Sequence, residues 1–216
     1  MEIWKQDILL EWKMKMVDVK LIDYTGAGSE NPAKYAASLL AFTKNTRLQM
    51  SPDGLDKFWN MGDEELDAEL EYMAGTIPSS WEFIDFTFTV NDISRACAQQ
   101  MTRTRTASFA MQSQRVTDMR LATYHNPILD KLDNTAPLSD DEYVAYQVAS
   151  DNYERVMDHS KSEYITAVDN GVPLEDARGM LPINLHCNLV AKYNMRGLVD
   201  LVRARENAVR VQGEYV

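Results

Sequence analysis

The residues best suited to chemistry are concentrated in one short stretch of an otherwise acidic chain. The 216-residue chain carries a formal net charge of -11, yet residues 93–117 contain no carboxylate. Four arginines lie there: Arg95, Arg103, Arg105 and Arg115. Guanidinium groups form strong hydrogen bonds with phosphates and carboxylates. The stretch therefore favours a local site for a small anionic ligand, with a solvated surface as the alternative.

Two of these arginines belong to an alternating sequence, TRTRT, at residues 102–106. The alternation has the period of a strand, and β-branched threonine favours extended backbone. In an extended run, Arg103 and Arg105 would lie on one side, where like charges repel unless an anion or water screens them. Two interpretations stay open. One is a solvated edge strand, and the other is a phosphate clamp in which each charge-assisted hydrogen bond contributes about 1.5–3 kcal/mol.

Two further polar residues fall on the apolar faces of predicted helices. Gln100 follows Ile93 by seven residues and Arg205 follows Leu198 by seven, so each shares a helix face with that apolar residue. Gln100 lies either at a fraying helix end or in a pocket. Arg205 either extends along the helix to solvent or points into a site.

The elements that position these residues are predicted from apolar periodicity and from capping and turn signals. Alternating patterns predict strands at residues 16–24, 81–90 and 183–193. Apolar spacings of three and four predict helices at residues 32–42, 63–74, 93–101, 139–170, 174–179 and 195–205. Residues 127–138, which contain two prolines and a polar run, are predicted to form a loop. Strands and helices mix without βαβ regularity, which indicates a single α+β domain over residues 1–216.

The predicted helix ends depend on particular residues. Gly75 is expected to end the helix over residues 63–74. Asn91 and Asp92 are expected to cap the helix over residues 93–101, and Asn194 the last helix. Ser139-Asp-Asp-Glu142 has the pattern of a capping box and opens the long helix.

Composition and motif content exclude several classes of protein. No apolar run approaches the roughly 18 residues that cross a bilayer, and no signal-peptide pattern is present, so a cytoplasmic protein with no membrane partner is expected. The acidic charge argues against nucleic acid as a partner. Histidines and cysteines lack metal-ligand spacing, so no metal is expected. Cys97 and Cys187 lie in apolar stretches and are expected to be buried free thiols.

Gln100-x-x-Arg103-Thr104-Arg105, followed after seven residues by Ser113-x-Arg115, resembles the signature of flavin-dependent thymidylate synthases. A second block, ARGMLPINL at residues 177–185, resembles the ARxxLPxNL motif of that family. Further matches to the family lie at Ser108, Asn194, Arg196 and Arg205. The resemblance spans about residues 16–216, and two motifs in the right order at the right distance make it specific.

The resemblance implies an α+β fold with a mixed or antiparallel sheet, flanking helices and a long helix. It implies a homotetramer whose sites form between subunits. The implied reaction is reductive methylation of dUMP at C5, with FAD as cofactor, methylenetetrahydrofolate as carbon donor and NADPH as reductant. No protein nucleophile is needed, in agreement with the lack of a plausible catalytic Cys–His pair.

The resemblance also assigns site residues. Residues expected to bind dUMP are Gln100, Gln112, Ser113, Arg115, Arg178 and Arg205, with Ser113 and Arg115 reaching in from a neighbouring subunit. Residues expected to bind FAD are Ser79, Arg103, Thr104, Arg105, Asn194 and Asp200. Arg178 and Arg205 are also expected to be catalytic, because a fixed guanidinium beside uracil stabilises negative charge at O4 or O2 as C5 becomes nucleophilic.

Several positions depart from the family pattern. Thr104 replaces a histidine, Ala110 an asparagine, Val116 a tyrosine and Asp200 an asparagine, and two further histidines are missing from residues 75–83. Most departures fall on the flavin and folate side, whereas the dUMP side is kept. Two alternatives therefore stay open: a dUMP or UMP C5-hydroxymethylase on the same scaffold, and a non-catalytic nucleotide-binding homologue.

Overall fold

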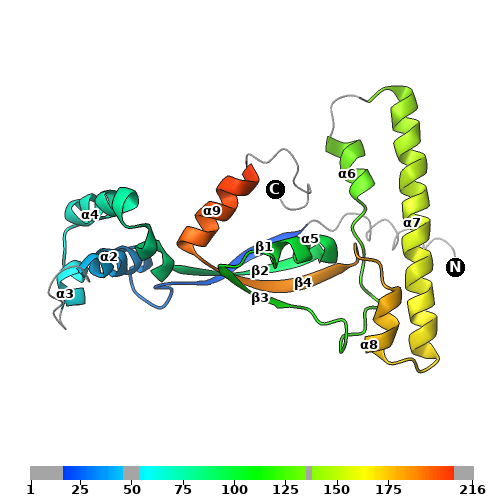
Figure 1. Ribbon diagram of the computed structural model, residues 1–216, viewed down its shortest axis with the longest axis horizontal. Coiled ribbons are helices and arrows are strands. Elements are labelled where there is room, and N and C mark those ends of the chain that lie inside the picture. Colours follow the sequence, from blue (N-terminus) through cyan, green and yellow to red (C-terminus); the bar gives the residue numbers. More distant parts are fainter. Residues whose placement is uncertain (1–16, 46–53, 135–137, 207–216) are drawn as a thin grey trace.

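The computed structural model describes residues 17–45, 54–134 and 138–206. Its strands are β1 (Asp18–Tyr24), β2 (Asp85–Ser94), β3 (Ala107–Met111) and β4 (His186–Asn194). Its α-helices are α2 (Pro32–Lys44), α3 (Gly54–Trp59), α4 (Asp63–Thr76), α5 (Arg95–Met101), α6 (Pro127–Asn134), α7 (Asp140–Asp169), α8 (Leu174–Ala177) and α9 (Met195–Glu206). Two 3₁₀ helices are η2 (Pro78–Phe83) and η3 (Arg178–Met180). The molecule is elongated, with the sheet between α2–α4 at one end and α6–α8 at the other (Figure 1).

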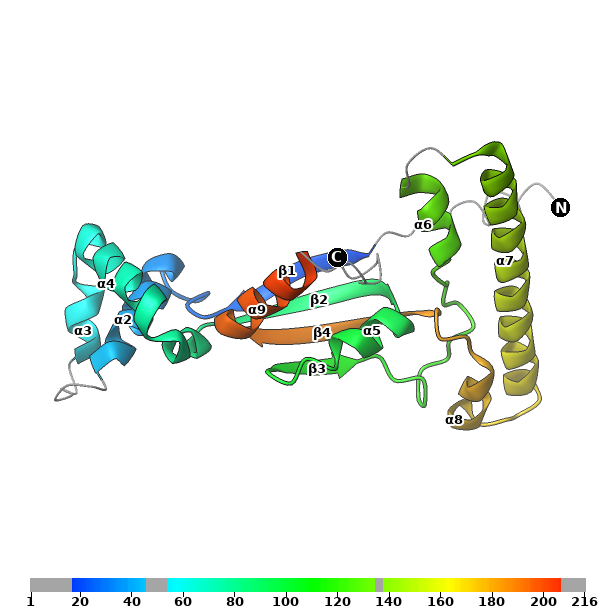
Figure 2. The ribbon, with the colours of Figure 1, turned by 45° about the horizontal axis from the view of Figure 1, so that its top comes forward.

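The sheet is antiparallel throughout the described part of the chain, in the strand order β1-β2-β4-β3. The late strand β4 therefore lies between β2 and β3, and Figure 2 shows β1 and β3 at opposite edges. Pairing of β2 with β4 brings Val90 opposite Leu189, and pairing of β3 with β4 brings Ala107 opposite Tyr193. The α+β prediction is confirmed, and of the two predicted sheet types the antiparallel one is present.

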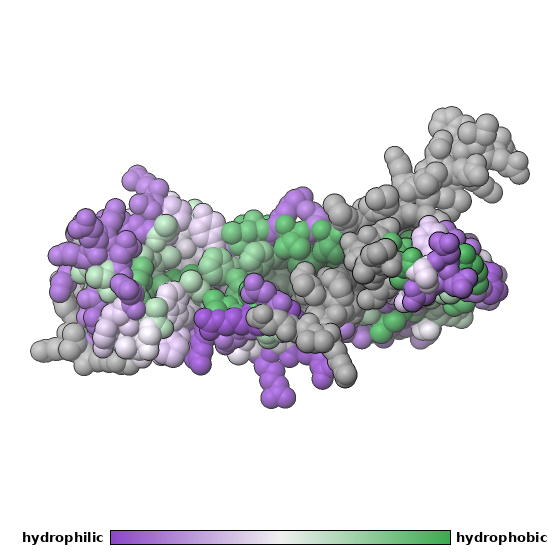
Figure 3. Space-filling view, turned by 90° about the horizontal axis from the view of Figure 1, so that it is seen from above, coloured by the Kyte–Doolittle hydropathy of each residue, from purple (hydrophilic) through white to green (hydrophobic). Residues whose placement is uncertain are grey.

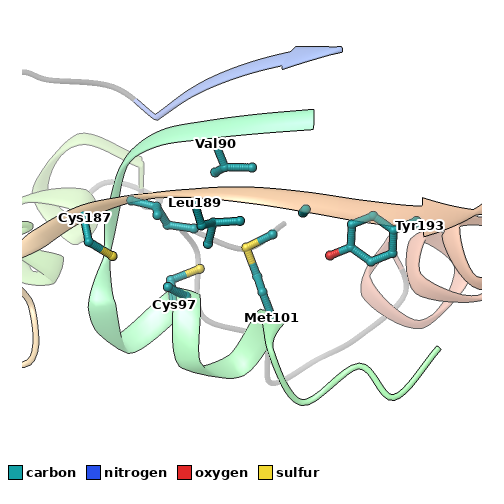
Figure 4. Close-up of a cluster of buried hydrophobic side chains, with 9 residues drawn as sticks. Val90, Cys97, Met101, Cys187, Leu189 and Tyr193 are labelled. Atoms are coloured by element: carbon teal, nitrogen blue, oxygen red, sulfur yellow. The ribbon is translucent and has the colours of Figure 1, made fainter. Parts of the chain in front are cut away.

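The main core lies between the sheet and α5, with α9 on the same face (Figure 1). Figure 4 shows side chains from β2, β4 and α5 converging there, including Val90, Leu189 and Met101. Cys97 and Cys187 belong to this cluster as buried free thiols, as expected from the sequence. Exposure alternates along β4 from buried Cys187 to exposed Lys192, so one face of the strand packs on this core and the other faces outward.

Three smaller clusters of described residues stabilise the ends of the molecule, and one of them, Ala41, Phe58 and Leu66, joins α2, α3 and α4. Leu40, Met73, Ile77 and Ile84 form a second between α2, α4 and the start of β2. Met119, Tyr164, Ala177 and Leu185 form the third between α7, α8 and the segment that precedes α6. The edge strand β1 leaves Val19, Leu21 and Ile22 exposed. Apolar side chains gather over the middle of the molecule in Figure 3.

Most predicted elements are present, and the differences have local causes. The strand predicted at residues 81–90 begins only at Asp85, because η2 occupies Pro78–Phe83. It then continues to Ser94 through a β-bulge at Asp92, whose φ is 57°. The cap of α5 is consequently Ser94, whose Oγ accepts a hydrogen bond from the Cys97 N–H at 3.0 Å, and not Asn91–Asp92.

Three other predictions are corrected by the structure. Gly75 does not end α4, which continues to Thr76 and is capped by Ile77. The predicted loop at residues 127–138 contains α6, with Pro127 at its first position, where a missing N–H costs nothing. The TRTRT sequence is not extended: residues 102–106 form a turn, called here the arginine turn, between α5 and β3.

The long helix is confirmed, together with its capping box. The Ser139 Oγ accepts from the Glu142 N–H, and the Glu142 carboxylate accepts from the Ser139 N–H at 3.0 Å. The Ser139 hydroxyl also donates to the Glu142 carboxylate, at 2.8 Å, and the two hydrogen bonds that this carboxylate accepts from Ser139 lower the pKa of Glu142. Within the described part of the chain, no helix is both long and apolar enough to cross a membrane.

Candidate functional site

The arginine turn presents two cations at the end of α5. The Arg103 N–H donates to the Gln100 carbonyl at 3.3 Å and the Thr104 N–H to the Met101 carbonyl at 3.0 Å, so the turn continues directly from the helix. The side chains of Arg103 and Arg105 are exposed. Among the described residues, neither guanidinium has a carboxylate partner, which leaves both available to an external anion.

The arginine turn packs against the first turn of α9. Asn194 caps that helix as predicted, because its Oδ1 accepts from the Gly197 N–H at 2.7 Å. Gly197 is buried, and a Cβ atom there would lie 3.0 Å from the Thr106 Oγ1 and 3.1 Å from the Asn194 Oδ1. A side chain at this position would require Thr106 or Asn194 to shift by a few tenths of an ångström, so glycine favours the close approach of the two segments.

The remaining residues assigned to the flavin side belong to the same end of the sheet. Asp200 is exposed on α9, and Ser79 is exposed in η2. η2 contacts α9, where the Arg196 Nη1 donates to the Glu82 carboxylate at 2.7 Å. The structure thus gathers Ser79, the arginine turn, Asn194 and Asp200 on neighbouring elements.

Gln112 and Ser113 lie at the opposite end of β3. The Gln112 N–H donates to the Asn188 carbonyl at 2.8 Å, and the Gln112 Oε1 accepts from the Asn188 N–H at 3.1 Å. These bonds extend the pairing of β3 with β4 and fix the Gln112 side chain against the backbone. The Ser113 Oγ accepts from the Arg115 N–H at 3.2 Å, which turns the chain toward α8.

Arg115 and Arg178 meet at one acidic residue, Glu175. The Arg115 Nε and Nη2 donate to the same Glu175 carboxylate oxygen, at 3.3 and 3.0 Å. The Arg178 Nε donates to the main-chain carbonyl of Glu175 at 3.0 Å. Glu175 was not identified from the sequence, although its position three residues before Arg178 on a predicted helix places both on one face.

The segment that follows Arg115 is anchored to α7. The buried Tyr164 hydroxyl accepts from the Met119 N–H at 3.1 Å and donates to Asp118 at 3.4 Å. Arg120 pairs with Asp118 and with Asp169 of α7. Desolvation acts to raise the pKa of Asp118, but the hydrogen bonds from Arg120 and Tyr164 outweigh it and lower that pKa.

A polar hollow of about 210 Å³ lies beside this anchored segment and next to Gln112. Asp118, Thr123, His186 and Asn188 also line it. The His186 Nδ1 is 2.7 Å from the Thr123 Oγ1, which holds the segment against β4. Within the described ranges, no group of three or more histidine, cysteine or acidic side chains could hold a metal ion.

Gln100 and Arg205 come from the last turns of α5 and α9. Both side chains are half-buried and both have contacts within the protein. The helices α5 and α9 that carry them cover the same face of the sheet (Figure 1).

The candidate site residues therefore form two groups within one chain. The arginine turn lies where β3 begins, and Gln112, Ser113 and Arg115 lie where it ends. β3 has five residues, which at about 3.3 Å per residue separates the two groups by roughly 17 Å. One chain does not bring the two groups together around a single small ligand.

Comparison with known proteins gives a family for this chain. The sequence model of the family described as "Thymidylate synthase complementing protein" matches residues 20–215. A protein from Saccharolobus solfataricus named "Flavin-dependent thymidylate synthase" is 29% identical over 195 residues, which cover 88% of this chain and 65% of that relative. A protein of the same name from Clostridium tetani is 28% identical over 197 residues, covering 88% of this chain and 74% of the relative.

The chain spans 65% of the length of the Saccharolobus relative and 65% of a third protein of that name, from Sulfurisphaera tokodaii, to which it is 27% identical. The match to the family nevertheless covers β2, β3 and β4, all of β1 except its first two residues, and both groups of candidate site residues. This chain belongs to the thymidylate synthase complementing protein family.

Proposed function

We propose that this chain is a flavin-dependent thymidylate synthase. It methylates dUMP at C5, with methylenetetrahydrofolate as carbon donor, NADPH as reductant and FAD as bound cofactor. One observation carries the proposal: a chain of this family presents two separate arginine groups at opposite ends of β3, and among the described residues one of them has no carboxylate partner. Two anionic ligands of different kinds would use these two groups.

The residues at the arginine turn fit a flavin dinucleotide. Arg103 and Arg105 supply guanidinium donors for phosphates, and the close approach at Gly197 places the turn beside the positive N-terminal end of α9. Thr104 and Ser79 add hydroxyl groups, and Asn194 and Asp200 line the same end. When bound, FAD supplies the redox chemistry that carries electrons from the reductant toward the nucleotide.

The second group fits a mononucleotide. Ser113 and Arg115 offer a hydroxyl and a guanidinium to the 5′-phosphate, with Gln112 as a further polar contact. Gln100, which lies beside the arginine turn, would contact the same nucleotide from another subunit. Arg178 and Arg205 bind the uracil, where a guanidinium fixed in a dry site stabilises the negative charge that develops at O4 or O2 as C5 becomes nucleophilic. The chain supplies no nucleophile in this mechanism, so its contribution is orientation, charge stabilisation and exclusion of water.

A complete site requires more than one chain. The roughly 17 Å between the two groups is too long for one chain to place the nucleotide against the flavin. A homotetramer, in which Ser113 and Arg115 of one subunit face the arginine turn of another, satisfies both ligands. The exposed apolar residues of β1 support such an assembly, because exposed apolar patches mark interaction surfaces.

The test is a product assay with the purified full chain. FAD uptake is followed by its visible absorbance, and the products from dUMP, methylenetetrahydrofolate and NADPH are identified by mass spectrometry. We expect dTMP, and we expect Arg178→Ala to reduce its formation whereas Arg155→Ala, an exposed arginine on α7, does not. Formation of 5-hydroxymethyl-dUMP without dTMP would replace methylation by hydroxymethylation, and dUMP binding without turnover would indicate a non-catalytic homologue.

A further inference from the structure

Glu175 connects two arginines that come from separate segments of the chain. Arg115 follows β3, and Arg178 begins η3 after the short helix α8. Glu175 uses its carboxylate for Arg115, at 3.0 and 3.3 Å, and its main-chain carbonyl for Arg178, at 3.0 Å. One residue therefore fixes where both guanidinium groups lie relative to each other.

The atoms that Glu175 leaves uncovered are those suited to a ligand. Arg178 is held by its Nε, and among the described residues neither of its Nη groups has a hydrogen-bond partner. Arg115 is held by its Nε and Nη2, and within the same part of the chain its Nη1 is likewise uncovered. Both guanidinium groups are thus held along one edge and present the other edge outward.

This contact contributes little to folding stability. The side chains of Arg115 and Glu175 are 63% and 51% exposed, and exposed ion pairs contribute little because water screens them and two long side chains must be ordered. The contact does restrict the arginine before any ligand arrives. Ordering one long side chain on binding weakens affinity by about two- to tenfold, and prior restriction removes that loss.

We propose that Glu175 is the positioning residue of the nucleotide site: its carboxylate orients Arg115 and its carbonyl orients Arg178, which sets their spacing for one nucleotide. This inference rests on the proposed function, since it requires both arginines to contact dUMP. Electrostatics alone makes the opposite prediction. A carboxylate beside a phosphate site repels the ligand, so its removal should strengthen dUMP binding unless the loss of arginine orientation has the larger effect.

Asp176 provides a matched control for the charge. It is the next residue of α8, is exposed, and has no side-chain partner among the described residues. Asp176→Asn removes one negative charge at nearly the same place without touching either arginine. Charge repulsion predicts tighter dUMP binding in both Asp176→Asn and Glu175→Ala. A positioning role instead predicts weaker dUMP binding in Glu175→Ala and unchanged or tighter binding in Asp176→Asn.

The experiment is calorimetric titration of dUMP into the full-length FAD-loaded protein, with thermal unfolding to confirm that each variant folds. We expect Glu175→Ala to raise the Kd for dUMP about two- to tenfold. Glu175→Gln, which keeps an oxygen that can accept from Arg115, should lie between it and the wild type. Asp176→Asn should leave the Kd unchanged or lower it. In turnover, the KM for dUMP should rise in Glu175→Ala with a smaller change in kcat.

Two outcomes overturn the inference, and they can be told apart. If Glu175→Ala and Glu175→Gln bind dUMP as tightly as the wild type or more tightly, Glu175 does not position the arginines, and the proposed function stands. If the wild type itself binds no dUMP, the proposed function fails and the inference fails with it.

Discussion

Replacement of Gly197 by alanine tests whether close packing of the arginine turn on α9 matters for cofactor binding. Alanine is favoured over glycine inside a helix by about 0.8–1 kcal/mol, so the substitution should stabilise α9 if nothing else changed. The added Cβ would, however, lie 3.0 Å from the Thr106 Oγ1 and 3.1 Å from the Asn194 Oδ1. Forcing extra volume into a packed contact typically costs about 1–3 kcal/mol.

The difference between these two terms gives the expected result. Gly197→Ala should lower the free energy of unfolding by about zero to 2 kcal/mol. Thr106 belongs to the arginine turn, so a shift of this residue that relieves the contact would disturb the turn. We therefore expect weaker FAD binding, measured by absorbance titration, in a protein that is still folded.

Gly75→Ala is the matched control for the helix effect. Gly75 lies in α4, and a Cβ atom there would meet no atom within 4 Å. This variant should gain up to about 1 kcal/mol in urea denaturation and bind FAD as the wild type does. If Gly197→Ala gained the same stability and bound FAD equally well, the packing argument for the turn would be refuted.

Four further changes test other parts of the structure. Tyr164→Phe leaves the buried Met119 N–H without its acceptor and should cost about 1–3 kcal/mol in urea denaturation, and a loss below 0.5 kcal/mol would contradict that role. Ser139→Ala removes the capping box of α7 and should cost about 1 kcal/mol by the same measurement. Arg178→Ala should lower kcat about 100-fold or more while the protein stays folded, and near-normal turnover would remove it from the catalytic machinery. The pKa of Asp118 is lowered in the folded protein, so its contribution to stability is complete above its ordinary value of 3.8 and is lost as the pH falls through the lower folded value. The stability difference between wild type and Asp118→Asn should therefore shrink as the pH falls below 3.8, and a constant difference would contradict the shift.

Elements with a strong periodic pattern could be predicted from the sequence. The alternation over residues 183–193 identifies β4 within a few residues, and the capping box at Ser139 locates the start of α7. The alternation in TRTRT suggests an extended run, but it reflects only neighbouring residues. The turn that forms there is set by the end of α5 and by packing on α9. The bulge at Asp92 has a similar origin: it follows from pairing with β4, far away in the sequence.

The candidate site was predictable as a set of residues but not as an arrangement. Arginine content and spacing identify Arg103, Arg105 and Arg115 as a cationic group. Their division between two ends of β3 depends on which strand lies next to β3, and no local pattern encodes that neighbour. The role of Glu175 could not be predicted either, because its contact with Arg115 joins two segments that are distant in the sequence and meet only in the tertiary fold.

The central position of β4 has a consequence for how the chain is made. β2 and β3 do not pair with each other, and both pair with a strand that is synthesised long after them. A nascent chain emerging from the ribosome therefore holds two unpaired strand edges until residue 194 has emerged. Such long-range closure slows folding, so translation speed and chaperone supply during this interval should decide the soluble yield of the protein.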